Sequence, residues 1–194
     1  MKLHPFSRHR QGFTLIELLV VVAIIALLAV GIISGYTKIT KGAKVKASQM
    51  VCVQVANAVS QFYSDYEGLP TEVGGEDTEQ TSMEGDLIAI LLAKGEVAKN
   101  PRKLNYLEGM KQAKKGSSGA FEDGLDFESD PTKPTLLDPW GQAYKIKMDS
   151  DLNNEIENPE KDATPKIIRG KRCIVWAPGP DKNYDTWNDN VKSW

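Results

Sequence analysis

The sequence predicts an α+β protein in which one long amino-terminal helix packs on a small antiparallel β-sheet head. Three observations predict it. From Leu18 to Ile33 no side chain is charged or able to form a hydrogen bond. Apolar residues then recur every three or four positions as far as Tyr66, which is the period of an amphipathic helix. Beyond Tyr66, apolar segments are short and are separated by Gly, Pro, Asn and Asp, as in short strands joined by turns.

The overall composition hides this division. The 194 residues carry a formal net charge of -2, and the mean hydropathy is -0.36. No block rich in Lys and Arg is interleaved with aromatic residues, so we expect no nucleic-acid partner. Two cysteines exclude a disulfide-dense scaffold and every CxxC motif.

The amino end predicts a leader followed by a membrane segment. Residues 1–12 carry three basic side chains and no acid, and positive charge holds such a segment on the cytoplasmic side. Residues 13–35 are longer than the apolar part of an ordinary secretory signal. As a helix they span roughly 34 Å, enough to cross a bilayer core of about 30 Å. We therefore expect residues 1–12 to be a leader peptide and residues 13–35 to be the transmembrane half of the long helix.

Glu17 is the exception in this segment, because it is the only residue between Arg10 and Lys38 that is charged at neutral pH. A charge at the centre of a membrane helix costs about 2.5–3.5 kcal/mol, and less near an end. Glu17 could extend to the headgroups from the first helical turn. Alternatively, it has a partner or a function inside the membrane.

The segment Gly12-Phe13-Thr14-Leu15-Ile16-Glu17 resembles the class III signal of type IV pilins and type II secretion pseudopilins. The resemblance implies that a prepilin peptidase cleaves after Gly12 and that the new amino terminus, Phe13, is methylated. Glu17 would then be the fifth residue of the mature chain, and its carboxylate would neutralise the Phe13 amine of an adjacent subunit during assembly. The implied architecture is the type IV pilin-like fold.

Residues 36–66 are predicted to be the amphipathic half of the same helix, ended by Gly68 and Pro70. Four lysines near its start either bind anionic headgroups or form a solvated face. The apolar stripe that should face the sheet consists of Ile39, Ala43, Ala47, Val51, Val55, Ala58, Phe62 and Tyr66.

Residues 67–194 are predicted to form the globular head. FYSDYEGLPT (residues 62–71) and Asp138-Pro139-Trp140-Gly141 resemble the major pseudopilin of type II secretion. We expect Pro139 and Gly141 to fix a turn, Trp140 to be a large buried anchor, and residues 144–148 to form a strand. A generic hairpin turn with a core Trp fits the second fragment equally well.

Other head segments have simpler interpretations. Residues 71–85 are expected to be a loop. Two stretches rich in Asp and Asn, whose side-chain oxygens could bind a metal ion, follow later in the chain. The remaining expectations are a helix from Leu87 to Lys94 capped by Asp86 and stopped by Gly95, an extended segment from Asn100 to Leu107, and a mobile loop at residues 109–120.

The first oxygen-rich stretch contains Asp149, Asp151 and Asn153 at alternating positions, as at the start of a calcium loop. Asn154 stands where the sharp turn of such a loop requires Gly. We therefore expect a polar hairpin here, with a calcium site as the alternative.

The second stretch is the carboxyl end, where a strand at residues 172–176 is followed by Gly179-Pro180-Asp181 and an acidic tail. This order resembles the terminal calcium-binding loop of the pseudopilins, which implies Asp181, Asp185 and Asp189 as ligands of a calcium ion. Lys182 departs from the family pattern, in which Gly is usual.

An alternative for this tail involves no metal. Trp187 and Trp194 would pack over the sheet, and the acids would face solvent. Cys52 and Cys173 leave a second alternative open, because they form either a disulfide between helix and sheet or two buried free thiols.

The sequence therefore predicts a non-enzymatic structural subunit of a pseudopilus or type IV pilus-like fibre, used in type II protein secretion. Its expected location is the bacterial inner membrane, crossed once, with the head in the periplasm. The expected partners are other copies, minor pilins or pseudopilins, prepilin peptidase, the inner-membrane assembly platform and the membrane itself. The alternative is a membrane-tethered periplasmic enzyme or binding domain, but no histidine follows His9 and neither GxSxG nor HExxH occurs.

Overall fold

The computed structural model describes residues 12–70, 81–94 and 99–194, apart from the side chains of residues 30–35. The predicted leader up to residue 11, most of the predicted loop at 71–85, and the helix stop at Gly95 lie outside the described residues. The chain forms two compact units, Met1–Lys41 and Gly42–Trp194, which are described separately below. The domain borders predicted at residues 12, 35 and 66 stay predictions.

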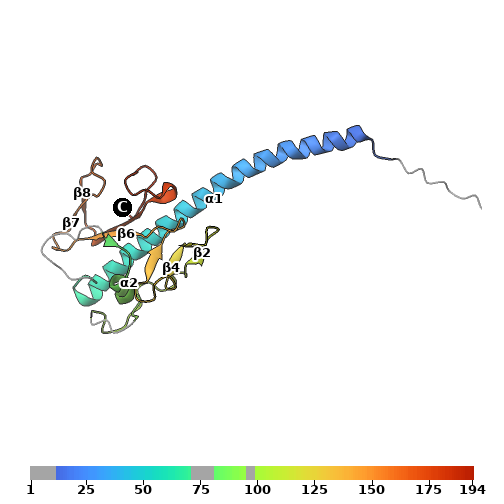
Figure 1. Cartoon of the computed structure of the whole chain (residues 1–194). Helices are drawn as coiled ribbons and strands as arrows, with labels where there is room; N and C mark the ends of the chain where they lie inside the picture. The colour runs from blue at the N-terminus through green and yellow to red at the C-terminus, as the bar shows by residue number, and fades with distance from the viewer. Residues whose placement is uncertain (1–11, 71–80, 95–98) are drawn as a thin grey trace, which may run out of the picture. The chain divides into compact units, whose positions relative to one another are not determined.

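Helix α1 (Leu15–Tyr66) is the long helix that the sequence predicts, and it is drawn from blue to teal in Figure 1. It ends before Gly68, as expected, because Glu67 adopts a left-handed conformation with φ 54° while its N–H still donates to the carbonyl of Tyr63. Within the described part of the chain, no helix is both long and apolar enough to cross a membrane. The transmembrane assignment of residues 13–35 is therefore not confirmed and stays a prediction.

The head is built on a four-stranded antiparallel sheet with the order β1-β6-β9-β10. Its strands are β1 (Thr81–Ser82), β6 (Lys145–Met148), β9 (Cys173–Ala177) and β10 (Val191–Lys192). Four residues of β6 pair with β9, from Lys145 opposite Trp176 to Met148 opposite Cys173. The two predicted strands are thus confirmed, and they form the centre of the sheet.

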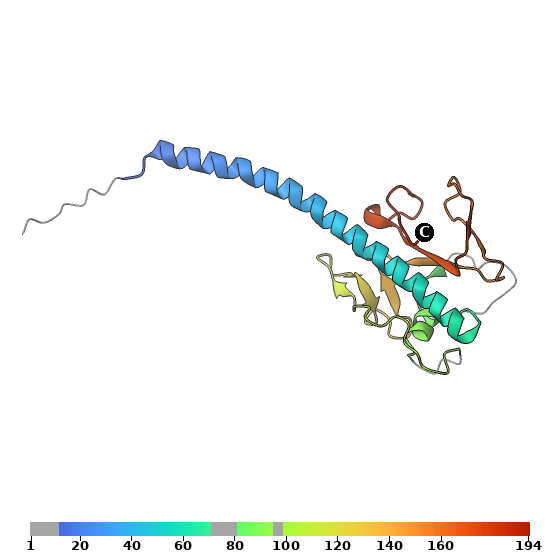
Figure 2. The same ribbon diagram turned by 180° about the vertical axis from the view of Figure 1, so that it is seen from behind.

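One face of the sheet packs against the carboxyl-terminal half of α1, which runs along it in Figures 1 and 2. Alternate residues of a strand point to opposite faces, so Cys173, Val175 and Ala177 face the helix. The helix contributes the fully or almost fully buried side chains Cys52, Val55, Ala58, Val59 and Phe62.

The opposite face of the sheet carries a second, smaller core. Ile174 and Trp176 of β9 are covered by the hairpin of β7 (Glu155–Glu157) and β8 (Ile167–Arg169) and by the carboxyl tail. This core identifies Trp176 as the buried anchor of the head. The prediction for Trp140 is wrong, since that residue is only half-buried and belongs to neither core.

The short helix of the head, α2 (Asp86–Leu91), ends earlier than predicted. Asp86 does not cap it, because Gly85 occupies the cap position and no side chain caps the helix. At the other end Ala93 is left-handed, with φ 55°, and the N–H groups of Ala93 and Lys94 donate to the carbonyls of Ile90 and Ala89. These bonds form a Schellman motif that ends the helix without Gly95.

Two loop predictions are also corrected. Residues 100–107 are not extended but contain turns around the buried side chain of Asn100. Its amide donates to the carbonyls of Ile90 and Leu104, and its Oδ1 accepts from Tyr66 and from the N–H of Leu104. Asn100 therefore ties this loop to both α1 and α2.

The second correction concerns residues 109–120, predicted to be a mobile loop. They contain β2 (Lys114–Lys115), which pairs with β3 (Phe121–Glu122) across a turn. The turn is closed by the N–H of Gly116, which donates to the carbonyl of Ala120. A further strand pair, β4 (Gly124–Asp126) with β5 (Thr135–Leu137), completes the head. The long helix followed by small antiparallel sheets confirms the predicted α+β, pilin-like fold class.

Candidate assembly site

The amino end of α1 is closed by a reciprocal pair of hydrogen bonds between Thr14 and Glu17. The N–H and the hydroxyl of Thr14 donate to Oε2 of Glu17 at 2.9 and 2.7 Å. The N–H of Glu17 in turn donates to Oγ1 of Thr14 at 3.3 Å. This arrangement is a capping box, which explains why the helix begins at Leu15 rather than at Phe13. Because every hydrogen bond that the described residues donate to this carboxylate uses Oε2, the second oxygen of Glu17 has room for another donor.

Gly12 and Phe13 precede this cap. Both are exposed, and the ring-bearing residue Phe13 is 77% accessible. A Cβ added at Gly12 would meet nothing within 4 Å, and Gly12 does not adopt a positive φ. Neither packing nor backbone conformation therefore explains why residue 12 is glycine.

The first unit of the chain leaves its apolar side chains uncovered. All twelve large apolar residues from Phe13 to Leu28 are exposed, and Leu15 and Leu27 are 87% and 78% accessible. Exposing so much apolar surface to water is unfavourable by about 25 cal/mol per Å². This segment therefore needs an apolar environment that the described part of its own chain does not provide.

The carboxyl-terminal loop is shaped by close backbone approach and by short polar turns. Its 3-10 turn, η1 (Gly179–Asp181), begins with Gly179 at φ 75°, where a Cβ would lie 2.2 Å from the carbonyl oxygen of Asp189. Asp181 and Asn183 each accept a hydrogen bond from the N–H two residues later, at 2.8 and 3.0 Å. The carboxylate of Asp181 thus stabilises the local turn by accepting the N–H of Asn183.

The aromatic residues of this tail pack on the sheet. The rings of Trp187 and Trp194 each lie 6.1 Å from that of Trp176. Lys192 lies over both outer indoles and forms an ion pair with Glu160, which fastens the chain end to the β7–β8 hairpin. The expected packing of Trp187 and Trp194 over the sheet is thus confirmed, and this packing does not test whether the tail binds a metal ion.

The fit of a metal ion to this loop can be judged from the acids themselves. Across the described ranges, no three or more His, Cys, Asp or Glu side chains gather closely enough to hold a metal ion. Asp181, Asp185 and Asp189 therefore do not converge on a common centre in this arrangement. The calcium assignment stays a prediction.

The loop after β6 is polar, as expected, but it is not a hairpin, because β6 pairs with β1 and β9 whereas β7 pairs with β8. Asp149 is fully buried, and its Oδ2 accepts from Arg172 at 2.9 Å and from the N–H of Asn154 at 3.1 Å. Burial raises the pKa of the Asp149 carboxyl, and these two donors oppose the shift. Arg172 also lies over the ring of Tyr63, so the ion pair links this loop to α1.

The turn at Asp138 holds a second buried carboxyl group. Its Oδ1 accepts from the N–H groups of Trp140 and Gln142 at 2.9 and 2.8 Å, while Oδ2 is buried and has no partner among the described residues. Burial raises the pKa of Asp138 to about 6, although the two N–H donors act in the opposite direction. Gly141 has φ 82°, and a Cβ there would approach the carbonyl oxygen of Phe121 to 2.9 Å. The turn therefore requires both its Asp and its Gly.

The two cysteines are buried free thiols. Cys52 lies against the carbonyl of Val191, whereas Cys173 lies against the carbonyl of Ala56. Burial raises the pKa of Cys173 to about 12 and that of Cys52 even further above its ordinary value. Both groups are therefore neutral at physiological pH.

Residues 7–33 match the family model described as the prokaryotic N-terminal methylation motif. The match includes Gly12, Phe13, Thr14 and Glu17. No curated protein and no solved structure gives a significant match to the chain.

The motif is the class III signal found in type IV pilins and pseudopilins. Together with the long helix and the small antiparallel sheets, it supports a pilin-like, structural subunit that is anchored at a membrane and assembles with other pilin subunits. The resemblance inferred from Gly12 to Glu17 is thus confirmed.

Three structural features were missed by sequence reasoning. The T-x-x-E spacing of Thr14 and Glu17 is itself the signature of a capping box and could have been found. The buried carboxyl of Asp138 and the linking amide of Asn100 depend on contacts between distant segments. No local sequence pattern predicts these contacts.

Proposed function

We propose that this chain is a structural subunit of a pseudopilus or type IV pilus-like fibre that serves type II protein secretion. In this proposal prepilin peptidase cleaves between Gly12 and Phe13, the Phe13 amine is methylated, and the mature chain assembles through its amino-terminal helix. The observation that carries the proposal is the match of residues 7–33 to the methylation motif, with Glu17 at the fifth position after Gly12.

The geometry of the cleavage region supports the processing step. Gly12 is exposed, and neither its backbone angle nor a neighbour among the described residues demands glycine there. A requirement outside the fold, such as the narrow active site of a peptidase, accounts for it. The exposed position of Phe13 next to the helix cap leaves the bond accessible to cleavage.

Glu17 acts in assembly through its charge. Thr14 holds one carboxylate oxygen in place, and the other accepts the Phe13 amine of a neighbouring subunit. Removing water from the two charges costs free energy, and an amine left there without its carboxylate is strongly unfavourable, so the need to pair each amine with a Glu17 fixes the stagger between neighbours.

The exposed apolar side chains of the same segment support a membrane anchor. The mature chain would cross the bacterial inner membrane once, with the head in the periplasm, until an assembly platform transfers it to the fibre. Minor pilins or pseudopilins and further copies of the chain are its partners in the fibre. The alternative, a tethered enzyme or binding domain, has no specific observation in its favour.

Two variants of Glu17 test this proposal. Glu17→Gln keeps a side chain that can complete the capping box but removes the charge, whereas Glu17→Leu removes both. We expect both variants to be processed at Gly12 and to yield no fibres, because the amine of the neighbour is left without its partner. Normal fibre yield from both variants would contradict the proposal. Fibres from Glu17→Gln alone would assign Glu17 only a capping role.

A further inference from the structure

The turn that carries Trp140 contacts two basic segments of the head. On one side, the side-chain amine of Lys44 on α1 donates to the carbonyl of Pro139 at 2.9 Å. On the other side the turn packs closely against β3, because a Cβ at Gly141 would lie 2.9 Å from the carbonyl oxygen of Phe121. Strand β3 in turn pairs with β2, which consists of two lysines. The turn therefore lies between the lysines of α1 and those of β2.

The exposed charge around this turn is mainly positive. Its five lysines are all exposed, and they are Lys44, Lys46, Lys111, Lys114 and Lys115. Among the described acids, Asp123 pairs with Lys111, whereas the carboxylate of Glu122 is directed at the turn residue Gly116. The other four lysines form no ion pair with a described residue, so their charges are uncompensated.

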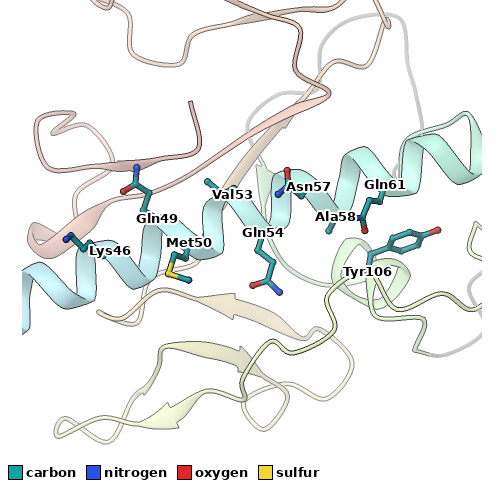
Figure 3. Close-up of a pocket in the computed structure, with 9 residues that line it drawn as sticks. All are labelled: Lys46, Gln49, Met50, Val53, Gln54, Asn57, Ala58, Gln61 and Tyr106. Atoms are coloured by element: carbon teal, nitrogen blue, oxygen red, sulfur yellow. The ribbon is translucent and has the colours of Figure 1, made fainter.

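The lysines of α1 within the head are confined to its beginning. From Ala47 to Ser64 the sequence contains no Asp, Glu, Lys or Arg. Figure 3 shows Lys46 at one end of the helix segment that lines a groove of about 770 Å³, and Tyr106 near the other end. In Figures 1 and 2 the β2–β3 hairpin lies beside the beginning of this segment, whereas the β7–β8 hairpin lies at the opposite end of the head. The positive charge is thus gathered at one end of the head.

Trp140 adds an amphipathic ring to this surface. It is only half-buried and belongs to neither core of the head. Tryptophan is enriched at the surface of a bilayer, where the apolar ring lies among the headgroups and the indole N–H stays hydrated. Lysines beside it attract the phosphates of anionic lipids. The two residue types together match an anionic bilayer surface.

A bilayer that holds residues 13–35 lies within reach of this surface. Lys44 follows residue 35 by nine residues, which is about 14 Å of helix. Headgroups extend about 6 Å beyond each side of the hydrocarbon core. The Cα atom of Lys44 is then no more than about 8 Å from the outer edge of the headgroups, which is about one Debye length at physiological salt.

We propose that Trp140 and the lysines around it dock the head on the anionic surface of the membrane that anchors the subunit. The proposal rests on the membrane anchor proposed above. The lysines attract the lipid phosphates, and the ring of Trp140 lies at the level of the headgroups. Each lysine held at the surface shifts the equilibrium towards the docked head by about fivefold. Docking orients the head before assembly, and departure of the subunit from the bilayer ends it.

Quenching of tryptophan fluorescence in the full-length protein tests the contact. The protein is reconstituted in vesicles of phosphatidylcholine, alone or with about one third phosphatidylglycerol, that contain a lipid with a spin label on its headgroup. We expect the label to quench a component of the fluorescence that Trp140→Phe lacks. This component should fall at least twofold without phosphatidylglycerol, and added salt should lower it because salt screens the lysines.

Two pairs of charge variants locate the contact. Lys114→Gln with Lys115→Gln should lower the quenching at least twofold. Lys161→Gln with Lys166→Gln removes the same charge from the exposed loop of the β7–β8 hairpin and should leave the quenching unchanged. Both pairs retain Trp140, so this comparison does not depend on the folding of Trp140→Phe.

Flotation of the protein with the vesicles separates this proposal from the anchor. If the protein floats but the Trp140 component is missing, does not depend on phosphatidylglycerol, or falls equally in both charge variants, the proposal is overturned and the anchor stands. Lower fibre yield from Trp140→Phe without any quenching of Trp140 would assign the surface to a contact between subunits and would also overturn it. If the protein does not float with the vesicles, the anchor fails and this proposal fails with it.

Discussion

The two halves of helix α1 form one continuous element, but they differ in what surrounds them. The half within the head buries Cys52, Val55, Val59 and Phe62 against the sheet. The half before Lys41 covers none of its large apolar side chains between Phe13 and Leu28. The hydrophobicity of a helix alone therefore does not show whether its apolar side chains are buried within the same chain. The polar residues interspersed in the second half mark the sheet-facing stripe, and their absence in the first half indicates that its surroundings come from other molecules or lipid.

Truncation of one apolar side chain in each half should separate the two roles most strongly. Phe62→Ala removes a ring that is 1% accessible, and we expect it to destabilise the head by about 3–5 kcal/mol. Ile25→Ala alters a side chain that is 60% accessible, so the melting temperature should not change. Thermal unfolding of both variants in detergent, followed by circular dichroism, measures the difference. Equal destabilisation by the two would show that the amino-terminal half packs within its own chain.

A variant of Asn100 tests whether buried hydrogen bonds, as well as apolar contacts, stabilise the head. Asn100→Ala removes the group that joins Tyr66 of α1 to Ile90 of α2 and leaves several buried donors and acceptors unpaired. We expect a loss of about 3 kcal/mol in the free energy of unfolding. Urea denaturation measures it, with Ser118→Ala at the exposed turn as the control. A loss below about 0.5 kcal/mol would mean that the link is dispensable.

The buried carboxyl of Asp138 predicts that the stability of the head depends on pH. Its raised pKa of about 6 means that the folded state binds the proton more tightly than the unfolded state does. The contribution to stability is therefore complete below the ordinary pKa of the carboxyl and is lost as the pH rises through 6. Asp138→Asn keeps the acceptor for Trp140 and Gln142 but carries no charge.

We expect Asp138→Asn to be more stable than the wild type by about 2 kcal/mol at pH 7.5, with the difference disappearing towards pH 4. Melting curves across this pH range measure the effect. A constant difference between the two proteins at every pH would mean that the Asp138 charge has no role in it.

The capping box should give a smaller effect, confined to the amino-terminal half. Thr14→Ala removes the hydroxyl that bonds Glu17, and we expect the first turn of α1 to lose about 1 kcal/mol. Thr14→Ser retains the hydroxyl and serves as the control. Amide hydrogen exchange of Leu15 to Leu18 in micelles should accelerate about fivefold in Thr14→Ala alone. Unchanged exchange would show that the box does not hold the helix end.

The calcium prediction has the smallest expected effect and concerns the head alone. If Asp181, Asp185 and Asp189 bind the ion, a free concentration fivefold above the dissociation constant adds roughly 1 kcal/mol of stability. A chelator should then lower the melting temperature by a few degrees, and Asp185→Asn should abolish the response. Identical melts with and without chelator would contradict the prediction.

The parts of the fold that the sequence predicts are those with long local patterns. Helix α1 is specified by periodicity over many turns, and its end by Gly68 and Pro70. Strand β6 alternates over four residues, and β9 is a continuous run of five apolar residues that is buried on both faces, and either pattern is enough to recognise a strand. The pair β2 and β3 has two residues in each strand, so no alternation could be seen.

Burial of the tryptophans could not be assigned from local sequence. Trp176 lies within a strand whose second face is covered by the tail, whereas Trp140 lies within the turn after Asp138, whose surroundings come from other segments. Of the candidate assembly site, Gly12, Phe13 and Glu17 were predictable because they occur in one short motif. The groove that lines the outer face of α1 beside Tyr106 was not predictable, because Tyr106 reaches it only through the folded loop around Asn100.

Mass spectrometry of the amino-terminal peptide from assembled protein tests the central claim most directly. We expect a peptide that starts at methylated Phe13, and we expect Gly12→Val, which places a branched side chain before the cleaved bond, to retain its leader. An intact Met1-to-Gln11 region on protein that still forms fibres would contradict the account.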